Sequence, residues 1–170
     1  MRIILALLAG GFGMVIASTG DKENWLYMRG NPAQTGYVQD KLPEKLSIIW
    51  SFQAGDAFES GVAIDRGMVF AGSMDENLYG LDAASGKLKW KQKVAPFKAS
   101  PAIHDHNVYV GDLDGKFHCF ECSSGKKKWS FETGAEAGGA NFFSNTVLFT
   151  SHDEHLYSLE LSGKENVNEF

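Results

Sequence analysis

The sequence lacks a positive charge excess, is poor in cysteine and has no apolar run long enough to cross a bilayer. Its 16 basic and 21 acidic residues give a net charge of −5 at pH 7. Because affinity for nucleic acid depends on a basic surface, charge gives no support to a nucleic-acid partner. With 44% hydrophobic and 12% aromatic residues, the 170-residue chain has the composition of a globular protein rather than a disordered one.

The two cysteines, Cys119 and Cys122, form a C-x-x-C motif without the residues that its known chemistries require. Ser123 follows the motif, whereas covalent haem attachment needs a His at that position. No second cysteine pair exists to complete a zinc site. We expect both cysteines in one strand, where side chains three positions apart point to opposite faces. The sequence therefore favours a packing role for both thiols.

The one long apolar stretch, Ile3 to Ile16, follows Arg2 and leads into Ala17, a small residue of the kind that a signal peptidase recognises. The stretch has about 14 residues, whereas a membrane-spanning helix needs roughly 20. A signal peptide over residues 1–17 is therefore favoured over an uncleaved anchor. No cysteine stands at the cleavage point to carry a lipid.

The rest of the chain is organised by a repeat of about 40 residues. Each copy has an apolar run, a turn with an aspartate, a second apolar run and a Ser-Gly-Lys turn. The first runs begin at Met68, Asn107 and Val147, and the Ser-Gly-Lys turns begin at Ser85, Ser124 and Ser162. Such periods with several short strands are typical of β-propeller blades, because a small sheet must be covered by neighbours on both faces. We predict an all-β partial propeller of about three blades, each of four antiparallel strands.

The repeat divides the chain into a signal peptide (1–17), an extended lead-in (18–44) and propeller repeats (45–170). The blades are expected at about 60–94, 99–133 and 138–170. Their first strands are expected at Gly61–Ile64, Ser100–Ile103 and Gly139–Phe142. Lys45–Phe52 is similar to the last strand of a repeat whose earlier strands are missing, because Trp50 stands one repeat length before Trp90.

The fourth strand of each blade is expected to alternate, with Leu88, Trp90 and Gln92 on one face and lysines on the other. Lysines on an outer strand hinder edge-to-edge aggregation. The basic clusters are Lys87, Lys89, Lys91 and Lys93 in the first blade and Lys126, Lys127 and Lys128 in the second. We interpret them as edge protection rather than as a binding surface.

The segment Leu81–Trp90, which reads LDAASGKLKW, resembles the repeat of the pyrroloquinoline-quinone-like (PQQ-like) propeller superfamily, whose pattern is close to A-L-D-A-x-T-G-x-x-x-W. The resemblance implies that the Trp and Gly of each motif dock one blade against the next, which suits Trp90 with Gly86 and Trp129 with Gly125. The docking residues that we assign are Trp50, Gly86, Trp90, Gly125 and Trp129.

The lead-in Trp25–Tyr37 is similar to that of secreted members of the superfamily, including the BamB-like scaffolds of outer-membrane assembly. This resemblance implies export to the periplasm or cell envelope of a Gram-negative-type bacterium. The chain departs from the pattern in two ways. The third repeat has no Trp after Gly163, and the lipid-bearing cysteine common in BamB-like members is missing.

A quinone-dependent enzyme of the superfamily would hold PQQ and calcium in a complete ring, with a stacking Trp and adjacent cysteines. The chain has no adjacent cysteines and its tryptophans occupy docking positions, so we expect neither cofactor and assign no catalytic or metal residue. The aspartates at equivalent positions, Asp75, Asp114 and Asp153, are expected as turn residues. The pairs His104/His106 and His152/His155 are expected in turns at opposite ends of the blades, where they cannot converge on a metal.

The function favoured by these features is a non-catalytic, secreted propeller scaffold that binds a protein or peptide partner. Two alternatives are a fragment of a PQQ-dependent dehydrogenase and the sensor propeller of a larger envelope protein. Propellers close with four to eight blades, so we expect three to leave open faces. The chain should therefore self-associate, aggregate, or occur as part of a longer polypeptide.

Export should remove the segment through Ala17, because the apolar run ends in residues that fit a signal peptidase site. Mass spectrometry of protein recovered from the cell envelope is expected to give a chain that begins at Ser18. Recovery of the chain with Met1 intact would contradict cleavage.

Overall fold

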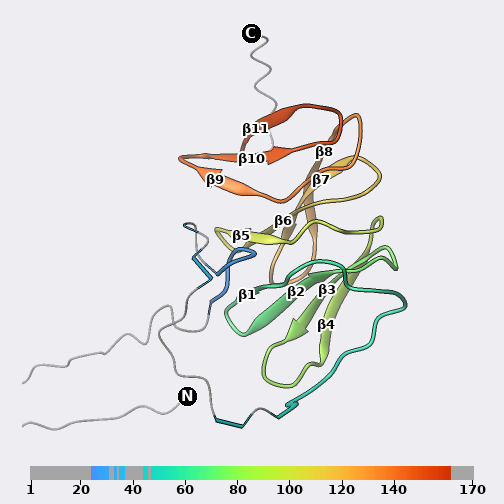
Figure 1. Ribbon diagram of the computed structural model, residues 1–170, viewed down its shortest axis with the longest axis vertical. Coiled ribbons are helices and arrows are strands. Elements are labelled where there is room, and N and C mark those ends of the chain that lie inside the picture. The colour runs from blue at the N-terminus through green and yellow to red at the C-terminus, as the bar shows by residue number, and fades with distance from the viewer. Residues whose placement is uncertain (1–23, 31–32, 34, 37–43, 46, 162–170) are drawn as a thin grey trace, which may run out of the picture.

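The computed structural model describes residues 24–30, 33, 35–36, 44–45 and 47–161, and these residues form three antiparallel sheets stacked face to face (Figure 1). Blade 1 contains β1 (Ala63–Asp65), β2 (Met68–Gly72), β3 (Asn77–Asp82) and β4 (Leu88–Lys93). Blade 2 contains β5 (Ala102–His104), β6 (Asn107–Gly111), β7 (Lys116–Glu121) and β8 (Lys127–Glu132). Blade 3 contains β9 (Asn141–Phe143), β10 (Thr146–Thr150) and β11 (Leu156–Glu160).

The strand order follows the chain within every sheet, and each strand of blade 2 begins one repeat length after its counterpart in blade 1. The prediction of an all-β partial propeller is confirmed. In the part of the chain that the structure describes, no helix has the length and apolarity of a membrane span.

The first strand of each blade begins two residues later than the sequence suggested. In blade 1 the strand is Ala63–Asp65 instead of Gly61–Ile64. The amide of Gly61 donates to the hydroxyl of Ser100 in the next blade, at 3.0 Å, and so does not enter the sheet ladder. The second and third strands lie where the apolar runs predicted them.

The first hairpins of blades 1 and 2 have two-residue turns in which both residues have positive φ. These residues are Arg66 (47°) and Gly67 (73°) in blade 1, and Asp105 (44°) and His106 (60°) in blade 2. Such turns match the twist of the flanking strands. His106 holds a conformation that a β-carbon disfavours, and its carbonyl accepts a hydrogen bond from the amide of Cys122 at 2.9 Å.

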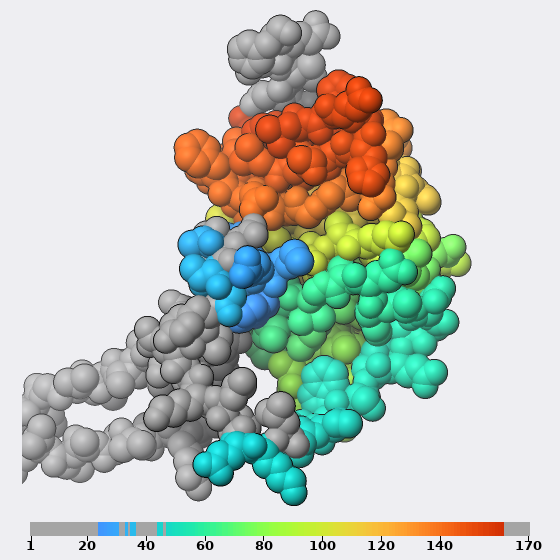
Figure 2. Space-filling model, in the orientation of Figure 1, coloured from blue at the N-terminus to red at the C-terminus, as the bar shows by residue number. Residues whose placement is uncertain are grey.

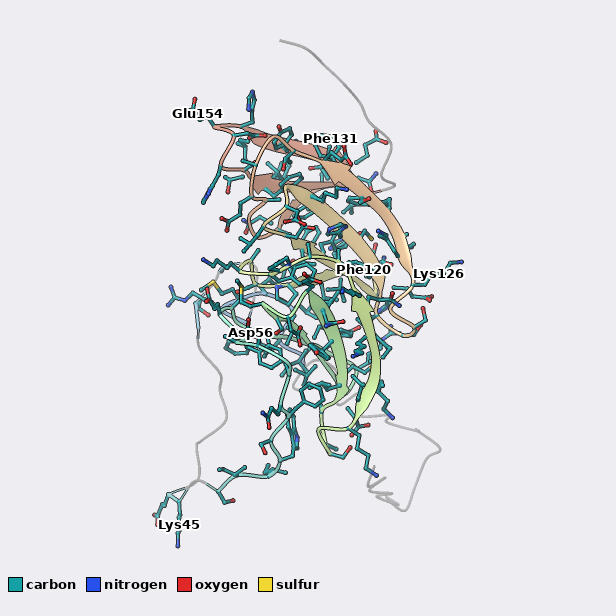
Figure 3. All side chains as sticks on the ribbon, turned by 90° about the vertical axis from the view of Figure 1, so that its right-hand side faces the viewer. Lys45, Asp56, Phe120, Lys126, Phe131 and Glu154 are labelled. Atoms are coloured by element: carbon teal, nitrogen blue, oxygen red, sulfur yellow. The ribbon has the colours of Figure 1, made fainter. Side chains whose placement is uncertain are left out.

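The core lies between the sheets. Blades 1 and 2 enclose Phe70, Leu78, Phe97, Val108 and Phe120, and blades 2 and 3 enclose Tyr109, Phe117, Val147 and Phe149. Figure 3 shows Phe120 inside the stack and Phe131 near the third sheet. Each fully buried apolar side chain stabilises the fold by about 1.5–3 kcal/mol. The stack therefore depends on face-to-face burial rather than on any single sheet.

Tryptophans lie across the blade junctions. The ring of Trp90 covers Gly125 of blade 2, where an added β-carbon would lie 2.6 Å from the ring, and its Nε1 donates to the carbonyl of Cys122 at 2.9 Å. Trp50 covers Gly86 in the same way and donates to the carbonyl of Ala83 at 2.9 Å. Each Trp thus meets the glycine of the following repeat, not the glycine of its own motif.

Trp129 contacts aromatic rings of its own blade, Tyr109 and Phe117, with ring centroids 5.9 and 6.3 Å away. Gly125, which was expected to dock with Trp129, contacts Trp90 instead. Gly163, the glycine of the following repeat, lies outside the described residues.

Two strand predictions are wrong. Residues 47–52 form no strand, because no neighbouring strand pairs with them among the described residues. Leu88 was expected on the face of β4 that carries Trp90, but it is 46% exposed. The register shifts between Gly80 and Leu81, so that Gly80 pairs with Trp90 while Leu81 pairs with Leu88. This bulge removes Leu88 from the face that carries Trp90.

Replacement of Gly125 by alanine should destabilise the protein by about 2–4 kcal/mol, because its φ of +71° disfavours a β-carbon and the methyl group would overlap the Trp90 ring. Gly67→Ala is the matched control, since its φ is +73° but nothing lies within 4 Å. We expect it to cost only about 1 kcal/mol. Urea denaturation of both variants measures the difference, and equal losses would show that the Trp90 contact is dispensable.

Candidate binding face along the inner strands

The first strands of the three blades lie on one side of the stack and receive the lead-in, residues 24–30. The amide of Trp25 donates to the carbonyl of Ile64 at 2.8 Å, and the amide of Ile64 donates back at 2.7 Å. The amide of Ile103 donates to the carbonyl of Leu26 at 2.8 Å. β1 and β5 are edge strands of their sheets. Trp25 and Leu26 are thus bound by main-chain hydrogen bonds to the first strands of two blades, in the manner of strand addition.

Side chains of the lead-in extend this contact to the third blade. Tyr27 is 8% exposed, and its ring meets Phe142 edge-on with centroids 5.9 Å apart. Burial raises the pKa of the Tyr27 phenol. Figure 2 shows the lead-in, in blue, seated between the green first sheet and the orange third sheet. The segment therefore contacts all three blades.

The lead-in reverses direction directly after these contacts. The amide of Gly30 donates to the carbonyl of Tyr27 at 2.9 Å. Gly30 has a φ of +87° and lies against the ring of Trp25, where an added β-carbon would be 2.7 Å away. Glycine is required here by both the backbone conformation and the close approach.

Two hollows of about 370 Å³ each flank the lead-in. The first, which we call the strand-entry hollow, is lined by Tyr27, Met28, Glu59–Gly61, Lys98–Ala102 and Gly139–Asn141. The second, which we call the polar hollow, is lined by Asn24, Leu26, Tyr27, Asp65, Arg66 and Ile103–His106. The two hollows share Tyr27. We call the surface formed by residues 24–30, these two hollows and the first strands β1, β5 and β9 the inner face.

The polar hollow contains a chain of hydrogen bonds across blades 1 and 2. Arg66 contacts Nε2 of His106. The other ring nitrogen, Nδ1, faces the buried carboxylate of Asp65 at 3.4 Å. His106 thus lies between a cation and an anion. This arrangement offers hydrogen-bonding groups to a ligand but no nucleophile.

The two histidine pairs lie on different blades. His104 ends β5 instead of lying in the turn, and it stacks on Phe142 with centroids 4.8 Å apart. His152 and His155 flank Glu154 in the β10–β11 turn. Figure 3 shows Glu154 and Lys126, which marks the β7–β8 turn, on opposite sides of the stack. Among the described residues no group of three or more His, Cys, Asp or Glu side chains is arranged to hold a metal ion.

Two of the three repeated aspartates have a bonding role that sequence reasoning missed. Asp75 accepts hydrogen bonds from the amide of Gly55, at 2.7 Å, and from the Tyr79 hydroxyl. Asp153 repeats this pattern with Gly134 and Tyr157, at 2.6 and 2.8 Å. Each aspartate thus ties the loop before its blade to the β2–β3 or β10–β11 turn. The recurrence of Tyr four residues after these aspartates was the available signal.

The bonds to Asp75 also set its ionisation. Burial alone would raise its pKa, but hydrogen bonds from Tyr79, Gly55 and Asn77 outweigh this effect and lower it to about 2. Burial and the carboxylate raise the pKa of Tyr79 to about 12. Hydrogen bonds likewise outweigh burial at Asp153 and hold its pKa below the ordinary value.

Blade 2 has a His–Asp pair where blades 1 and 3 have the Tyr–Asp pair. His118 stands where the other blades have Tyr, and its Nε2 lies 2.7 Å from a carboxylate oxygen of Asp112, with both side chains 1% exposed. Asp114, the equivalent of Asp75, makes no hydrogen bond among the described residues and is exposed.

Both cysteines are free and buried. Cys119 faces blade 3 and Cys122 faces blade 1, so the prediction of opposite faces is confirmed. Cys122 follows β7 instead of lying in it, which corrects the expected strand. Burial raises the pKa of Cys119 to about 11 and that of Cys122 to about 12. Thiols this weakly acidic are poor nucleophiles at neutral pH.

The stacked meanders of three or four strands and the recurrent Trp–Gly contacts define a β-propeller repeat protein of the PQQ-like type. Residues 37–167 match the family model described as outer membrane protein assembly factor BamB. The chain belongs to this BamB family of PQQ-like propeller repeats. A comparison with curated protein sequences finds no match.

Solved structures agree with the fold. BamB from Moraxella catarrhalis is 26% identical, with a TM-score of 0.61, over 69% of this chain and 38% of that chain. A europium-containing methanol dehydrogenase is 15% identical with a TM-score of 0.70, over 85% of this chain and 31% of that chain. Quinohemoprotein alcohol dehydrogenase ADHIIG from Pseudomonas putida HK5 is 18% identical with a TM-score of 0.72, over 85% of this chain and 26% of that chain. This chain therefore spans less than two fifths of each of these proteins.

Asp75→Asn should make the protein less stable by about 1 kcal/mol near neutral pH, because charge-assisted hydrogen bonds are lost. A depressed folded-state pKa gives stability that is complete above the ordinary value of 3.8 and is lost as pH falls through about 2. The difference between wild type and variant should therefore shrink over that interval. Asp114→Asn is the control and should change little at any pH. Denaturant titrations across this range would contradict the assignment if both variants behave alike.

Proposed function

We propose that this protein is a non-catalytic scaffold of the cell envelope whose inner face binds an extended segment of another protein. The observation that carries the proposal is the lead-in itself. It exchanges two main-chain hydrogen bonds with β1, accepts one from β5, and places Tyr27 against Phe142 of blade 3. The strands β1 and β5 thus already bind a short segment through main-chain groups.

The inner face has the features of strand-addition sites. In such sites, main-chain hydrogen bonds to the bound segment give affinity whatever its sequence, and pockets beside the edge strand select its side chains. The strand-entry hollow can take apolar side chains beside Met28, which is 63% exposed. The polar hollow presents Arg66 and His106. A partner with alternating apolar and polar residues suits both hollows.

Family membership supports the cellular setting. The matching family is described as an outer membrane assembly factor, and the first seventeen residues have the pattern of a signal peptide. Strands of outer-membrane proteins alternate apolar and polar residues, which is the pattern the inner face suits. We also assign Trp50, Gly86, Trp90, Gly125 and Trp129 to blade docking, with Trp50 and Trp90 in contact with the glycines of the next repeat.

The dehydrogenase alternative draws on the fold alone, because the two dehydrogenases are only 15% and 18% identical. The cofactor's requirements can be compared with the described residues. Trp50 and Trp90 are committed to glycine contacts at blade junctions, and the two cysteines are separate and buried. The scaffold function fits these residues better.

The test is binding of a short fluorescent peptide with alternating apolar and polar residues, measured by anisotropy. We expect it to bind more tightly than a scrambled peptide of the same composition. Met28→Arg should weaken binding about tenfold, equivalent to about 1.4 kcal/mol, because it places a charge in the strand-entry hollow. Ser123→Arg, which adds the same charge to an exposed turn of blade 2, should leave binding unchanged. Equal binding of both peptides would refute the proposal.

A further inference from the structure

Two neighbouring blades carry exposed lysines on their outer strands. β4 and β8 are the last strands of their sheets, and six of the 16 basic residues of the chain lie in or just before the first half of these two strands. All six are exposed. We call this surface the outer-strand patch, and it consists of Lys87, Leu88, Lys89 and Lys91 from blade 1 and Lys126, Lys127 and Lys128 from blade 2.

The contact between Trp90 and Gly125 brings the two halves of the patch together. Trp90 lies between Lys89 and Lys91 in the chain, and its ring covers Gly125, which directly precedes Lys126. Figure 3 shows Lys126 on the outer side of the stack. Residues 50–54 pack on the other face of blade 1, and blade 3 packs on the other face of blade 2. The patch therefore belongs to two blades that have described neighbours on both sides.

The patch is basic although the chain as a whole is acidic, with a net charge of −5. Two carboxylates lie beside it. Asp82 is 3.3 Å from Nζ of Lys89, and Glu121, whose amide donates to the carbonyl of Lys126, accepts a hydrogen bond from Ser124. Lys89 is the one patch lysine that forms an ion pair in the described part of the chain. Five cations are thus available to an anionic ligand.

An exposed leucine lies among these lysines. The bulge in blade 1 pairs Leu88 with Leu81 and leaves Leu88 46% exposed, between Lys87 and Lys89. Lysines on an outer strand hinder edge-to-edge pairing, but this role gives no reason for a leucine between them. An apolar side chain flanked by lysines is typical of surfaces that bind at a membrane interface, where the apolar group enters the headgroup region and the cations meet anionic lipids.

We propose that the outer-strand patch binds the surface of an anionic lipid bilayer, with the ammonium groups against lipid phosphates and Leu88 inserted between headgroups. An acidic protein would meet the same cations, but Leu88 favours lipid. Neither described hollow is lined by a patch residue, which suits contact with a broad surface. The first and last strands lie at opposite edges of each sheet, so the proposal does not depend on peptide binding at the inner face.

Cosedimentation of the full chain with vesicles tests the charge. We expect binding to phosphatidylcholine vesicles that contain about a third phosphatidylglycerol and none to phosphatidylcholine alone, because each lysine near an anionic surface strengthens binding about fivefold. Lys127→Gln/Lys128→Gln should therefore bind about 25-fold more weakly. The control Lys98→Gln/Lys116→Gln removes the same charge from lysines that are paired with Glu59 and Glu132, and it should change binding less than twofold. Equal loss in the two double variants, or no binding to the anionic vesicles, would overturn the proposal.

The leucine distinguishes a bilayer from other anions. Leu88→Ser should weaken vesicle binding about fivefold, because the apolar contribution is lost, and it should keep the salt dependence of the wild type. Leu156→Ser is the matched control, since Leu156 is also exposed but lies in blade 3. Both variants should melt like the wild type. Insensitivity to Leu88→Ser together with binding to polyglutamate would indicate an acidic protein partner, and stronger release by inorganic phosphate than by sodium chloride of equal ionic strength would indicate a site for free phosphate. Either result would overturn the proposal.

Discussion

Every sheet in this protein depends on its neighbour, because a sheet of three or four short strands cannot bury two apolar faces by itself. The stacking of flat faces alone would leave the angle between blades poorly defined. We propose that the Trp–Gly contacts define this angle. Trp90 spans the junction between blades 1 and 2, with its ring against Gly125 and its Nε1 bound to the Cys122 carbonyl. A residue larger than glycine would hold the two sheets apart.

The two interfaces between blades differ chemically from each other, and one of them resembles the packing of Phe52 on blade 1. Phe52 meets Tyr79 and Phe131 meets Tyr157, with ring centroids 5.2 and 5.3 Å apart. Between blades 1 and 2 the same positions hold Gln92 and His118, and His118 is bound to the buried Asp112. A buried ionisable pair gains little stability after desolvation, and removal of one partner strands the other. Both members of this pair belong to blade 2, so the pair holds β7 and the β6–β7 turn of that blade together and does not join two blades.

The fold could be predicted from the sequence because the residues that specify it recur at a regular spacing. The regular spacing of the repeat predicted the sheets, and the alternation of Trp90 and Gln92 with lysines predicted the outward face of β4. Predictions that depended on the position of a single residue were wrong more often than those that depended on the repeat. Leu88 and Gly61 were misplaced, the first by a β-bulge and the second by a side-chain hydrogen bond from outside its blade. Such features depend on one contact in space and leave no periodic trace.

The binding face illustrates the same limit. Trp25 and Tyr27 belong to no repeat, so the sequence could suggest only an extended or looped segment before the propeller. In the structure this segment lies across the first strands, where successive blades converge and where edge strands would otherwise present unpaired main-chain groups. One segment thus contacts all three blades, through Trp25 on β1, Leu26 on β5 and Tyr27 against Phe142 of β9. These contacts join residues that are far apart in the sequence and outside the repeat, and for that reason the repeat pattern could not reveal them.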